Sequence, residues 1–228
     1  MKLSVVIPVY NEKNTIKDIV AKVKAVNNFD KELIVVDDGS TDGTREILAD
    51  LQKEQSDLKV VFKEKNSGKG DTLRVGFQHS TGDYVIVQDA DLEYDPKDYK
   101  LLLEALKTND AAVVYGSRFS GKYEDMSSLH YVGNRLLTLI TNVLFGVNLT
   151  DMETCYKLVP GEFIRKLDIK SKRFNFEPEI TAKILKSHLK ICEVPINYKG
   201  RTFSEGKKIT WKDGISALWT LVKYKFTN

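Results

Sequence analysis

Cysteine is scarce in this sequence, and several common motifs are missing. Only two cysteines, Cys155 and Cys192, occur among 228 residues, and no CxxC spacing joins them. We therefore expect neither a disulfide framework nor a zinc site, and the composition suits a reducing, cytosolic compartment. GxGxxG and GxxxxGK[ST] are also absent, which argues against a dinucleotide-dependent dehydrogenase and a P-loop nucleoside triphosphatase.

Long apolar runs are absent as well. No stretch reaches the roughly 18–20 apolar residues that cross a bilayer. The N-terminus, MKLSVVIPVYNE, lacks the small-residue cleavage site of a secretory signal, and we interpret it as a first β-strand. The composition, 42% hydrophobic and 29% charged, is that of a globular protein large enough to bury a core.

Charge is distributed unevenly along the chain. From residue 129 onward there are 17 Lys and Arg against 9 Asp and Glu, whereas the first 128 residues have 18 against 23. A basic half often faces phosphates or an anionic membrane, although it can also be a solvated surface. Nothing in the sequence indicates nucleic-acid binding.

Strand and helix patterns alternate through the first 117 residues. Continuous apolar strands separated by amphipathic helices predict an α/β fold, a Rossmann-like, mostly parallel sheet with helices on both faces. The expected strands are Leu3–Val9, Glu32–Val36, Leu58–Phe62, Tyr84–Gln88 and Ala111–Tyr115. The expected helices are Asn14–Val26, Asp42–Gln55, Asp71–His79 and Lys97–Lys107.

The rhythm changes after Gly116. We expect residues 119–129 to be a polar loop, and Leu136–Leu149 to be a core helix or one that lies in a membrane interface. The remaining expected elements are a helix at Phe176–Ser187, a strand at Lys190–Pro195, a basic loop at 199–212 and an aromatic-rich helix at Trp211–Phe226.

Polar residues follow four of the predicted strands, at the sheet edge where open α/β proteins bind ligands. The fourth strand runs directly into Asp89 and Asp91. In an extended chain these side chains point the same way, and two unpaired carboxylates would repel each other. A divalent cation removes that conflict, so the Asp-x-Asp pattern predicts a site for Mg²⁺ or Mn²⁺ with a diphosphate. Asp95, before Pro96, is expected to cap a helix, as is Ser40 or Thr41.

Taken together and in order, these clusters resemble the family-2 glycosyltransferases with a glycosyltransferase-A fold. Later segments resemble the dolichol-phosphate mannosyltransferase and polyprenyl-phosphate hexosyltransferase branch. The first group of motifs is VVIPVYNE, VVDDGSTDGT, NSGKGDTLRVGF, GDYVIVQDADLEYDP and VYGSRF. The second is GNRLLTLITNVLFGV, DMETCYKLVP, FNFEPEITAKI and EVPINYKGRTFSEGKKI. DMETCYK departs from the form found in the eukaryotic mannosyltransferases, which leaves the donor open.

The resemblance implies a role for residues in both parts of the chain. Residues 1–118 would bind the nucleotide-sugar donor and residues 119–228 the acceptor, within one continuous catalytic domain. The implied nucleoside-pocket residues are Pro8, Tyr10, Glu12 and Asp38, with Ala90 at the ribose or sugar. The implied metal ligands are Asp89, Asp91 and Glu93. The implied phosphate residues are Arg201 and Lys207 for the donor, and Arg118 and Arg135 for the acceptor.

The implied reaction is the metal-dependent, inverting transfer of a hexose to a polyprenyl or dolichyl phosphate. The donor would be GDP-mannose or UDP-glucose. A phosphate monoester is already an oxyanion at pH 7, so no general base is needed. We expect a peripheral protein at the cytoplasmic face of a membrane, held by Leu136–Leu149, the C-terminal helix or a membrane-protein partner. The C-terminal helix has aromatic and basic residues that suit a membrane interface, although an amphipathic core helix fits them equally: Trp211, Trp219, Tyr224, Phe226, Lys212, Lys223 and Lys225.

Three alternatives stay open. A sugar or protein hydroxyl acceptor would require a base, for which Asp151 or Glu153 is a candidate. A nucleotidyltransferase would use the same metal–phosphate edge and release pyrophosphate. A non-catalytic module that binds a membrane surface would use the acids only as a polar rim.

Overall fold

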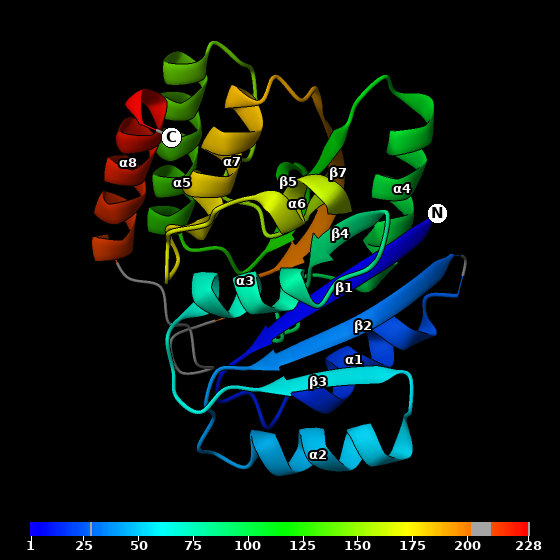
Figure 1. Cartoon of the computed structure of the whole chain (residues 1–228). Coiled ribbons are helices and arrows are strands. Elements are labelled where there is room, and N and C mark those ends of the chain that lie inside the picture. Colours follow the sequence, from blue (N-terminus) through cyan, green and yellow to red (C-terminus); the bar gives the residue numbers. More distant parts are fainter. Residues whose placement is uncertain (28, 202–210, 228) are drawn as a thin grey trace. The chain divides into compact units, whose positions relative to one another are not determined.

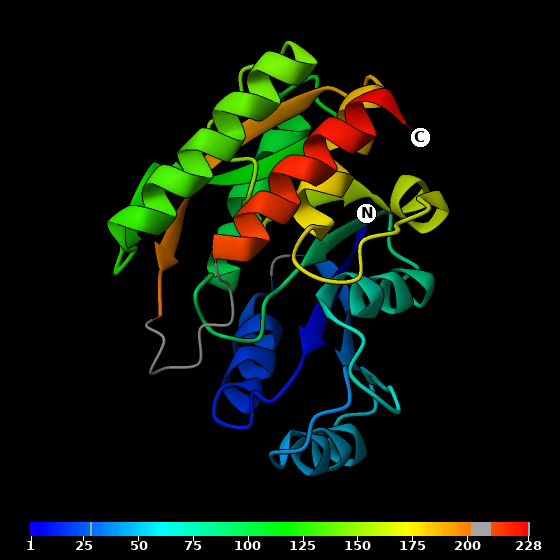
Figure 2. The ribbon, with the colours of Figure 1, turned by 90° about the vertical axis from the view of Figure 1, so that its left-hand side faces the viewer.

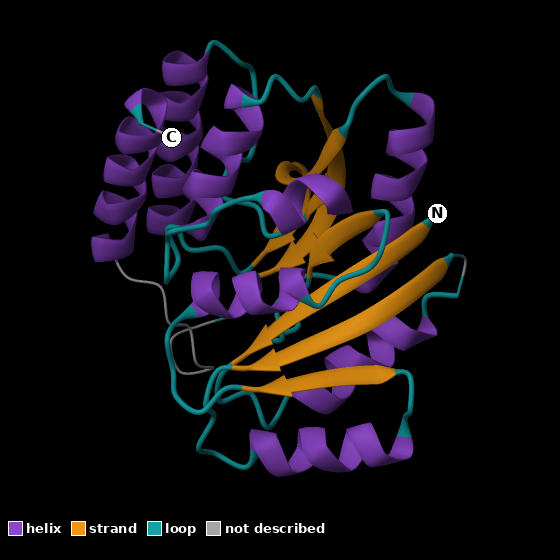
Figure 3. Cartoon of the chain, in the orientation of Figure 1, coloured by secondary structure: helices purple, strands orange, loops and turns teal. Residues whose placement is uncertain are grey.

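The computed structural model describes residues 1–27, 29–201 and 211–227. They contain seven strands and nine helical segments (Figure 3). The strands are β1 (Lys2–Val9), β2 (Asp30–Asp37), β3 (Leu58–Phe62), β4 (Tyr84–Val87), β5 (Val113–Glu124), β6 (Lys157–Pro160) and β7 (Ile191–Lys199). The helices are α1 (Ile16–Ala25), α2 (Thr44–Glu54), α3 (Lys69–Gln78), the 3₁₀ turn η1 (Pro96–Asp98), α4 (Tyr99–Thr108), α5 (Ser128–Phe145), α6 (Gly161–Lys166), α7 (Phe176–Lys186) and α8 (Trp211–Phe226).

The chain divides into two compact units. The first, here called the donor unit, comprises residues 1–100 and 158–173, and the second, the acceptor unit, comprises 101–157 and 174–228. Their bounds differ from the 1–118 and 119–228 halves expected from sequence, because residues 101–118 belong to the second unit and residues 158–173 return to the first. The names follow the predicted division of function, which remains a prediction.

The donor unit is built on parallel strands in the order β3-β2-β1-β4, with β6 antiparallel beside β4. β1 is buried from Leu3 to Ile7 and β2 from Leu33 to Asp37, which explains the β-branched, apolar residues in these parts of both strands. Helix α3 packs on β1 and β2, and the two views place α1 on the opposite face of these strands (Figures 1 and 2). The prediction of a mostly parallel sheet with helices on both faces is confirmed here.

The acceptor unit pairs β5 with β7 in parallel. Helices α5, α7 and α8 lie side by side in both views and contact one another (Figures 1 and 2). The loop expected at 119–129 is wrong, since β5 continues to Glu124 and α5 already begins at Ser128. The second half of β5 is largely exposed and polar, so its sequence has no apolar signature, and its pairing with β7 makes it a strand.

The starts of α2 and η1 bear on the two expected helix caps. Gly43 precedes α2, so neither Ser40 nor Thr41 caps that helix. The Asp95 prediction is confirmed, because its Oδ1 accepts a hydrogen bond from Lys97 N at 3.0 Å, with Pro96 at the first position of the turn. The short elements β6 and α6 carried too few residues of a clear period to be predicted.

Candidate active site

The loops after β1 and β2 are tied together by side chains. Asn11, with φ of 52°, donates its backbone N–H to Ser40 Oγ at 2.9 Å, and its Oδ1 accepts from Thr41 N at 2.9 Å. The Glu12 N–H is bound in turn by Thr44 Oγ1 at 3.0 Å. Of the predicted nucleoside-pocket residues, Pro8 lies in β1 and Tyr10 and Glu12 lie in the loop after it, and all three are partly exposed.

Asp38 lies in a network that joins β2 to the loop before α3. It is 3% exposed, and its carboxylate accepts from Lys63 Nζ at 2.7 Å, Ser67 N at 2.9 Å and Gly68 N at 2.8 Å. Gly68 has φ of 98°, and a Cβ there would collide with the carbonyl of Lys172, so glycine is required. Asp38 therefore holds the NSGKG loop in place. The sequence predicted only a role for Asp38 at the nucleoside and not this contact.

The segment after β4 does not continue as a strand. Ala90 and Asp91 form a turn, Leu92 has φ of 65°, and Asp91 Oδ1 accepts from Glu93 N at 3.2 Å. The backbone from Asp89 to Asp91 is therefore not extended as expected, and the convergence of the two carboxylates on one spot stays a prediction. Ala90 is buried, whereas the three acidic side chains of this turn are partly exposed.

Lys69, the first residue of α3, pairs with Asp89. Its Nζ lies 2.7 Å from Asp89 Oδ1 and 3.0 Å from Oδ2. The positive charge required beside Asp89 is thus supplied by the chain itself, from the NSGKG motif.

The turn after β4 offers three carboxylates, those of Asp89, Asp91 and Glu93, as possible ligands for a divalent cation. Within residues 1–27, 29–201 and 211–227, no three His, Cys, Asp or Glu side chains gather in a set that could hold a metal. Glu93 is therefore not brought together with Asp89 and Asp91 as a third ligand. Carboxylate oxygens suit Mg²⁺ or Mn²⁺, and Mg²⁺ commonly uses one or two carboxylates plus substrate phosphates. Asp89 and Asp91 fit such an ion in kind and number.

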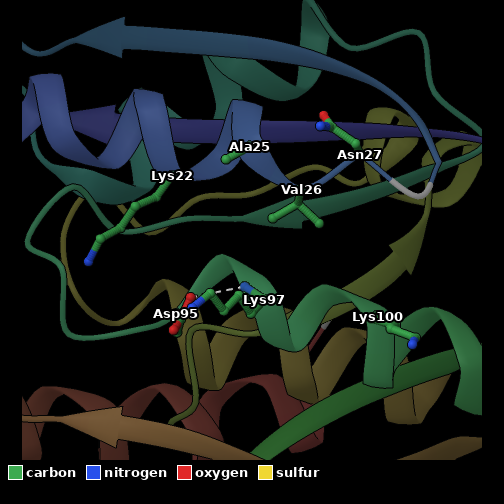
Figure 4. A pocket seen from close by; sticks show the side chains of 7 residues that line it. All are labelled: Lys22, Ala25, Val26, Asn27, Asp95, Lys97 and Lys100. Atoms are coloured by element: carbon green, nitrogen blue, oxygen red, sulfur yellow. Dashed lines mark hydrogen bonds between the residues drawn. The ribbon is translucent and has the colours of Figure 1, made fainter.

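A shallow groove of about 600 Å³ lies elsewhere on the donor unit (Figure 4). It runs between the end of α1 and η1. Its lining is Lys22, Ala25, Val26, Asn27, Asp95, Lys97 and Lys100, which includes none of the predicted site residues.

Arg118, in the acceptor unit, is buried against Asp151. Its Nε and Nη2 each lie 2.7 Å from an Asp151 oxygen, and its backbone N–H donates to Oδ2 at 3.0 Å. Asp151 is completely buried. A carboxylate that already accepts three hydrogen bonds is poorly placed to take a proton from a hydroxyl group, so Asp151 does not fit the role of a general base.

Arg135 is exposed and lies close to the same cluster. Its Nη1 donates to the Thr150 carbonyl at 3.2 Å, and both Arg118 and Arg135 stand over the Phe119 ring at 5.5 Å. Glu193 accepts from the backbone N–H groups of Thr150, at 2.7 Å, and Asp151, at 3.1 Å. One loop thus connects the two arginines that were predicted to bind the acceptor phosphate.

Glu153 differs from Asp151 and Glu193, whose carboxylates accept the hydrogen bonds described above. Its Oε1 is enclosed and has no hydrogen-bond partner among the described residues, although the residue as a whole is partly exposed. Desolvation raises its pKa to about 7, and nearby Glu177 and Asp151 act in the same direction against Lys157 and Arg118. A carboxyl group with this pKa can exchange a proton near neutral pH.

The last two predicted donor residues belong to the basic loop. Arg201 is partly exposed, and Lys207 lies outside the described residues. The sequence interpretation gave no role to Lys63, Lys69, Phe119 or Glu193. Lys69 stands in a motif that had been singled out, but its pairing with Asp89, 20 residues away, has no sequence signal.

The strands and helices of this chain have the arrangement of the glycosyltransferase-A fold. Solved structures of glucosyl-3-phosphoglycerate synthase from Mycobacterium tuberculosis share this glycosyltransferase-A fold. Their TM-scores are 0.74 and 0.76 at 21% identity, covering 98% and 100% of this chain and 79% of theirs. Those crystals contain Mn²⁺ and UDP, and another contains Mg²⁺ and UDP.

The family follows from the sequence match. The model of glycosyl transferase family 2 matches residues 4–167, and the chain belongs to this family.

Three related proteins are similar to this chain over most of its length. The chain is 31% identical over 232 residues to the low-salt glycan biosynthesis hexosyltransferase Agl6 of Haloferax volcanii. It is 27% identical over 212 residues to a dolichol-phosphate mannosyltransferase of Pyrococcus furiosus, and 29% identical over 216 residues to an undecaprenyl-phosphate mannosyltransferase of Micrococcus luteus. These matches cover 99%, 91% and 91% of this chain, which spans 53%, 59% and 87% of the respective relatives.

The Arg118–Asp151 pair predicts a large effect on stability. Asp151→Asn leaves a buried guanidinium without its counter-charge, which should lower the free energy of unfolding by about 3 kcal/mol, as measured by urea denaturation. Asp110→Asn, which removes an exposed partner of Lys190, is the control and should leave the midpoint unchanged. An unchanged midpoint for Asp151→Asn would contradict the structural role of the pair.

Proposed function

We propose that the chain transfers a hexose from a nucleotide-sugar donor to a polyprenyl phosphate at a membrane surface. Family membership supports the glycosyltransferase activity, and the names of the Pyrococcus and Micrococcus relatives support the lipid-phosphate acceptor. The observation that carries the proposal is the pair of carboxylates, Asp89 and Asp91, that directly follows the buried strand β4. GDP-mannose, which would donate mannose, and UDP-glucose, which would donate glucose, both remain candidate donors.

In the proposed reaction the donor unit binds the nucleotide. Pro8, Tyr10, Glu12 and Asp38 would contact the nucleoside, and Ala90 the ribose or sugar. Asp89 and Asp91 would hold Mg²⁺ or Mn²⁺, which supplies positive charge against the leaving diphosphate. Arg201 and Lys207 would add to that charge.

The acceptor unit would orient the lipid phosphate. Arg135 is exposed, and the Thr150 carbonyl and the Phe119 ring hold its guanidinium. It is thus the arginine better suited to direct contact with a phosphate. Arg118, buried on Asp151, would fix the loop and contribute charge from behind it. Since the acceptor is already an oxyanion, these residues orient it and do not need to deprotonate it.

We also propose that α5 and α8 lie on the membrane. On α5, the only fully buried side chains are Thr138 and Thr141, while apolar side chains spaced by three or four residues face outward. Exposed apolar residues of α5 and of α8, which packs beside it, are Leu129, Val132, Leu136, Leu139, Val143, Ile215, Leu218, Trp219 and Phe226. An outward apolar stripe of this kind suits an interfacial helix.

The charged and aromatic residues of α8 refine this membrane proposal. Tyr224, expected at the membrane interface, is buried, whereas Lys223 and Lys225 remain beside the stripe. No described helix is both long and apolar enough to cross a membrane. The side chains of Trp211 and Lys212, also expected at the interface, lie outside the described residues.

A hydroxyl acceptor is the second candidate, and Glu153 favours it. Its enclosed Oε1 and its pKa near 7 are the properties of a general base, which transfer to a lipid phosphate would not require.

The donor site predicts metal-dependent nucleotide binding. In a thermal-shift panel of GDP, UDP, CDP and dTDP, one nucleotide should raise the melting temperature with Mn²⁺ but not with EDTA. A ligand at about a hundred times its dissociation constant adds roughly 2.7 kcal/mol to the stability of the protein. Asp91→Asn should abolish the shift. Asp95→Asn, which changes a neighbouring capping residue in the same way, should keep it. No shift with any nucleotide would refute the donor site and favour a membrane-binding module.

Glu153→Gln separates the two acceptor classes. If a hydroxyl is the acceptor, transfer to soluble acceptors such as glucose or 3-phosphoglycerate should rise with pH through about 7, where Glu153 loses its proton. Glu153→Gln should then reduce this transfer about a hundredfold or more. If polyprenyl phosphate is the acceptor, the same variant should keep most of the activity. Rates are compared by product release from labelled donor.

The apolar stripe predicts binding to protein-free vesicles. In flotation with phosphatidylcholine and phosphatidylglycerol vesicles, the double substitution Val143→Ser and Trp219→Ser should lower the bound fraction at least about fivefold, because each change removes buried apolar area. Leu101→Ser, on α4, is the control and should leave flotation unchanged. If the unsubstituted protein does not float, membrane attachment would need a protein partner.

A further inference from the structure

The contact between Lys69 and Asp89 places the ammonium group on both oxygens of a carboxylate. The Nζ distances are 2.7 and 3.0 Å, and the two side chains are only 17% and 21% exposed. Asp89 is also one of the two carboxylates that would hold the divalent cation. The lysine and the cation would therefore use the same oxygens.

The backbone that carries Lys69 is fixed on both sides. Before it, the Gly68 N–H donates to Asp38 at 2.8 Å. After it, the N–H groups of Gly70 and Asp71 donate to the Lys172 carbonyl at 3.0 and 3.3 Å. Only the four-carbon stem of Lys69 is left to move, and a lysine ammonium is a compact charge on a flexible stem. The ammonium can change partner while the loop stays where it is.

We propose that Lys69 is a diphosphate-binding residue and that it competes with the divalent cation for Asp89. Without the cation, Lys69 neutralises Asp89. With the cation and nucleotide present, its ammonium passes to the diphosphate oxygens, where it adds a charge-assisted hydrogen bond. This inference rests on the proposed donor site. A lysine that served only to neutralise Asp89 would affect cation binding but not diphosphate binding.

The test measures the two ligands separately on Lys69→Met, which keeps the apolar stem and removes the charge. Binding of Mn²⁺ alone, followed by electron paramagnetic resonance of the free ion, should tighten about fivefold because the competing cation is gone. Binding of the diphosphate, measured by calorimetry in saturating Mn²⁺ with GDP or UDP, should weaken about tenfold or more. Lys69→Arg should retain most of the diphosphate affinity.

Lys65→Met is the matched control, since Lys65 is exposed in the same loop and its loss changes the net charge equally. It should alter neither affinity. Unchanged or weaker Mn²⁺ binding in Lys69→Met overturns the competition, and unchanged diphosphate binding overturns the role at the diphosphate. If the unsubstituted protein binds neither ligand, the donor site itself fails, which is a distinct result. Lys69→Gln replaces Lys69→Met if that variant does not fold.

Discussion

Withdrawing a carboxylate from water is costly unless positive charge or N–H donors lie against it. This chain meets that condition repeatedly with cations from its own loops, helices and strand β5. The pairs are Asp37–Arg45, Asp38–Lys63, Asp89–Lys69 and Asp151–Arg118. Each pair also fixes the segment that carries the cation, so the loops around the candidate site are positioned by the same contacts that make its acids tolerable.

These pairs bear on function because they decide which charges a substrate would meet. Asp38 is occupied by the backbone of the NSGKG loop, and Arg118 by a buried aspartate. Both serve first to organise their surroundings. Arg135 and Lys69 are less enclosed. Arg135 is exposed and donates to a carbonyl, and Lys69 pairs with Asp89, whose side chain is 21% exposed. In the proposed reaction Lys69 would bind the donor diphosphate and Arg135 the acceptor phosphate. The more deeply buried pairs would hold the surrounding segments in place.

Glu153 departs from this pattern. It has charged neighbours of both signs, yet its enclosed Oε1 has no hydrogen-bond partner within the described residues. An enclosed, unbonded carboxyl oxygen costs stability, so its presence is more readily explained by a chemical task than by packing. For this reason Glu153 is the residue at which the choice between a phosphate and a hydroxyl acceptor is tested.

The sequence by itself determined the elements whose pattern is local. The bounds of β3 and α8 were predicted to the residue, as was the cap at Asp95, because apolar period and capping chemistry depend on neighbours a few residues away. The motifs likewise indicated the family. Only the tertiary structure decided that residues 119–124 form a strand, that Asp89-Ala90-Asp91 turns, and that Lys69 and Arg118 meet their aspartates. Those features depend on pairing between segments 20 to 80 residues apart, or on backbone conformations that such pairing enforces, and no local period records them.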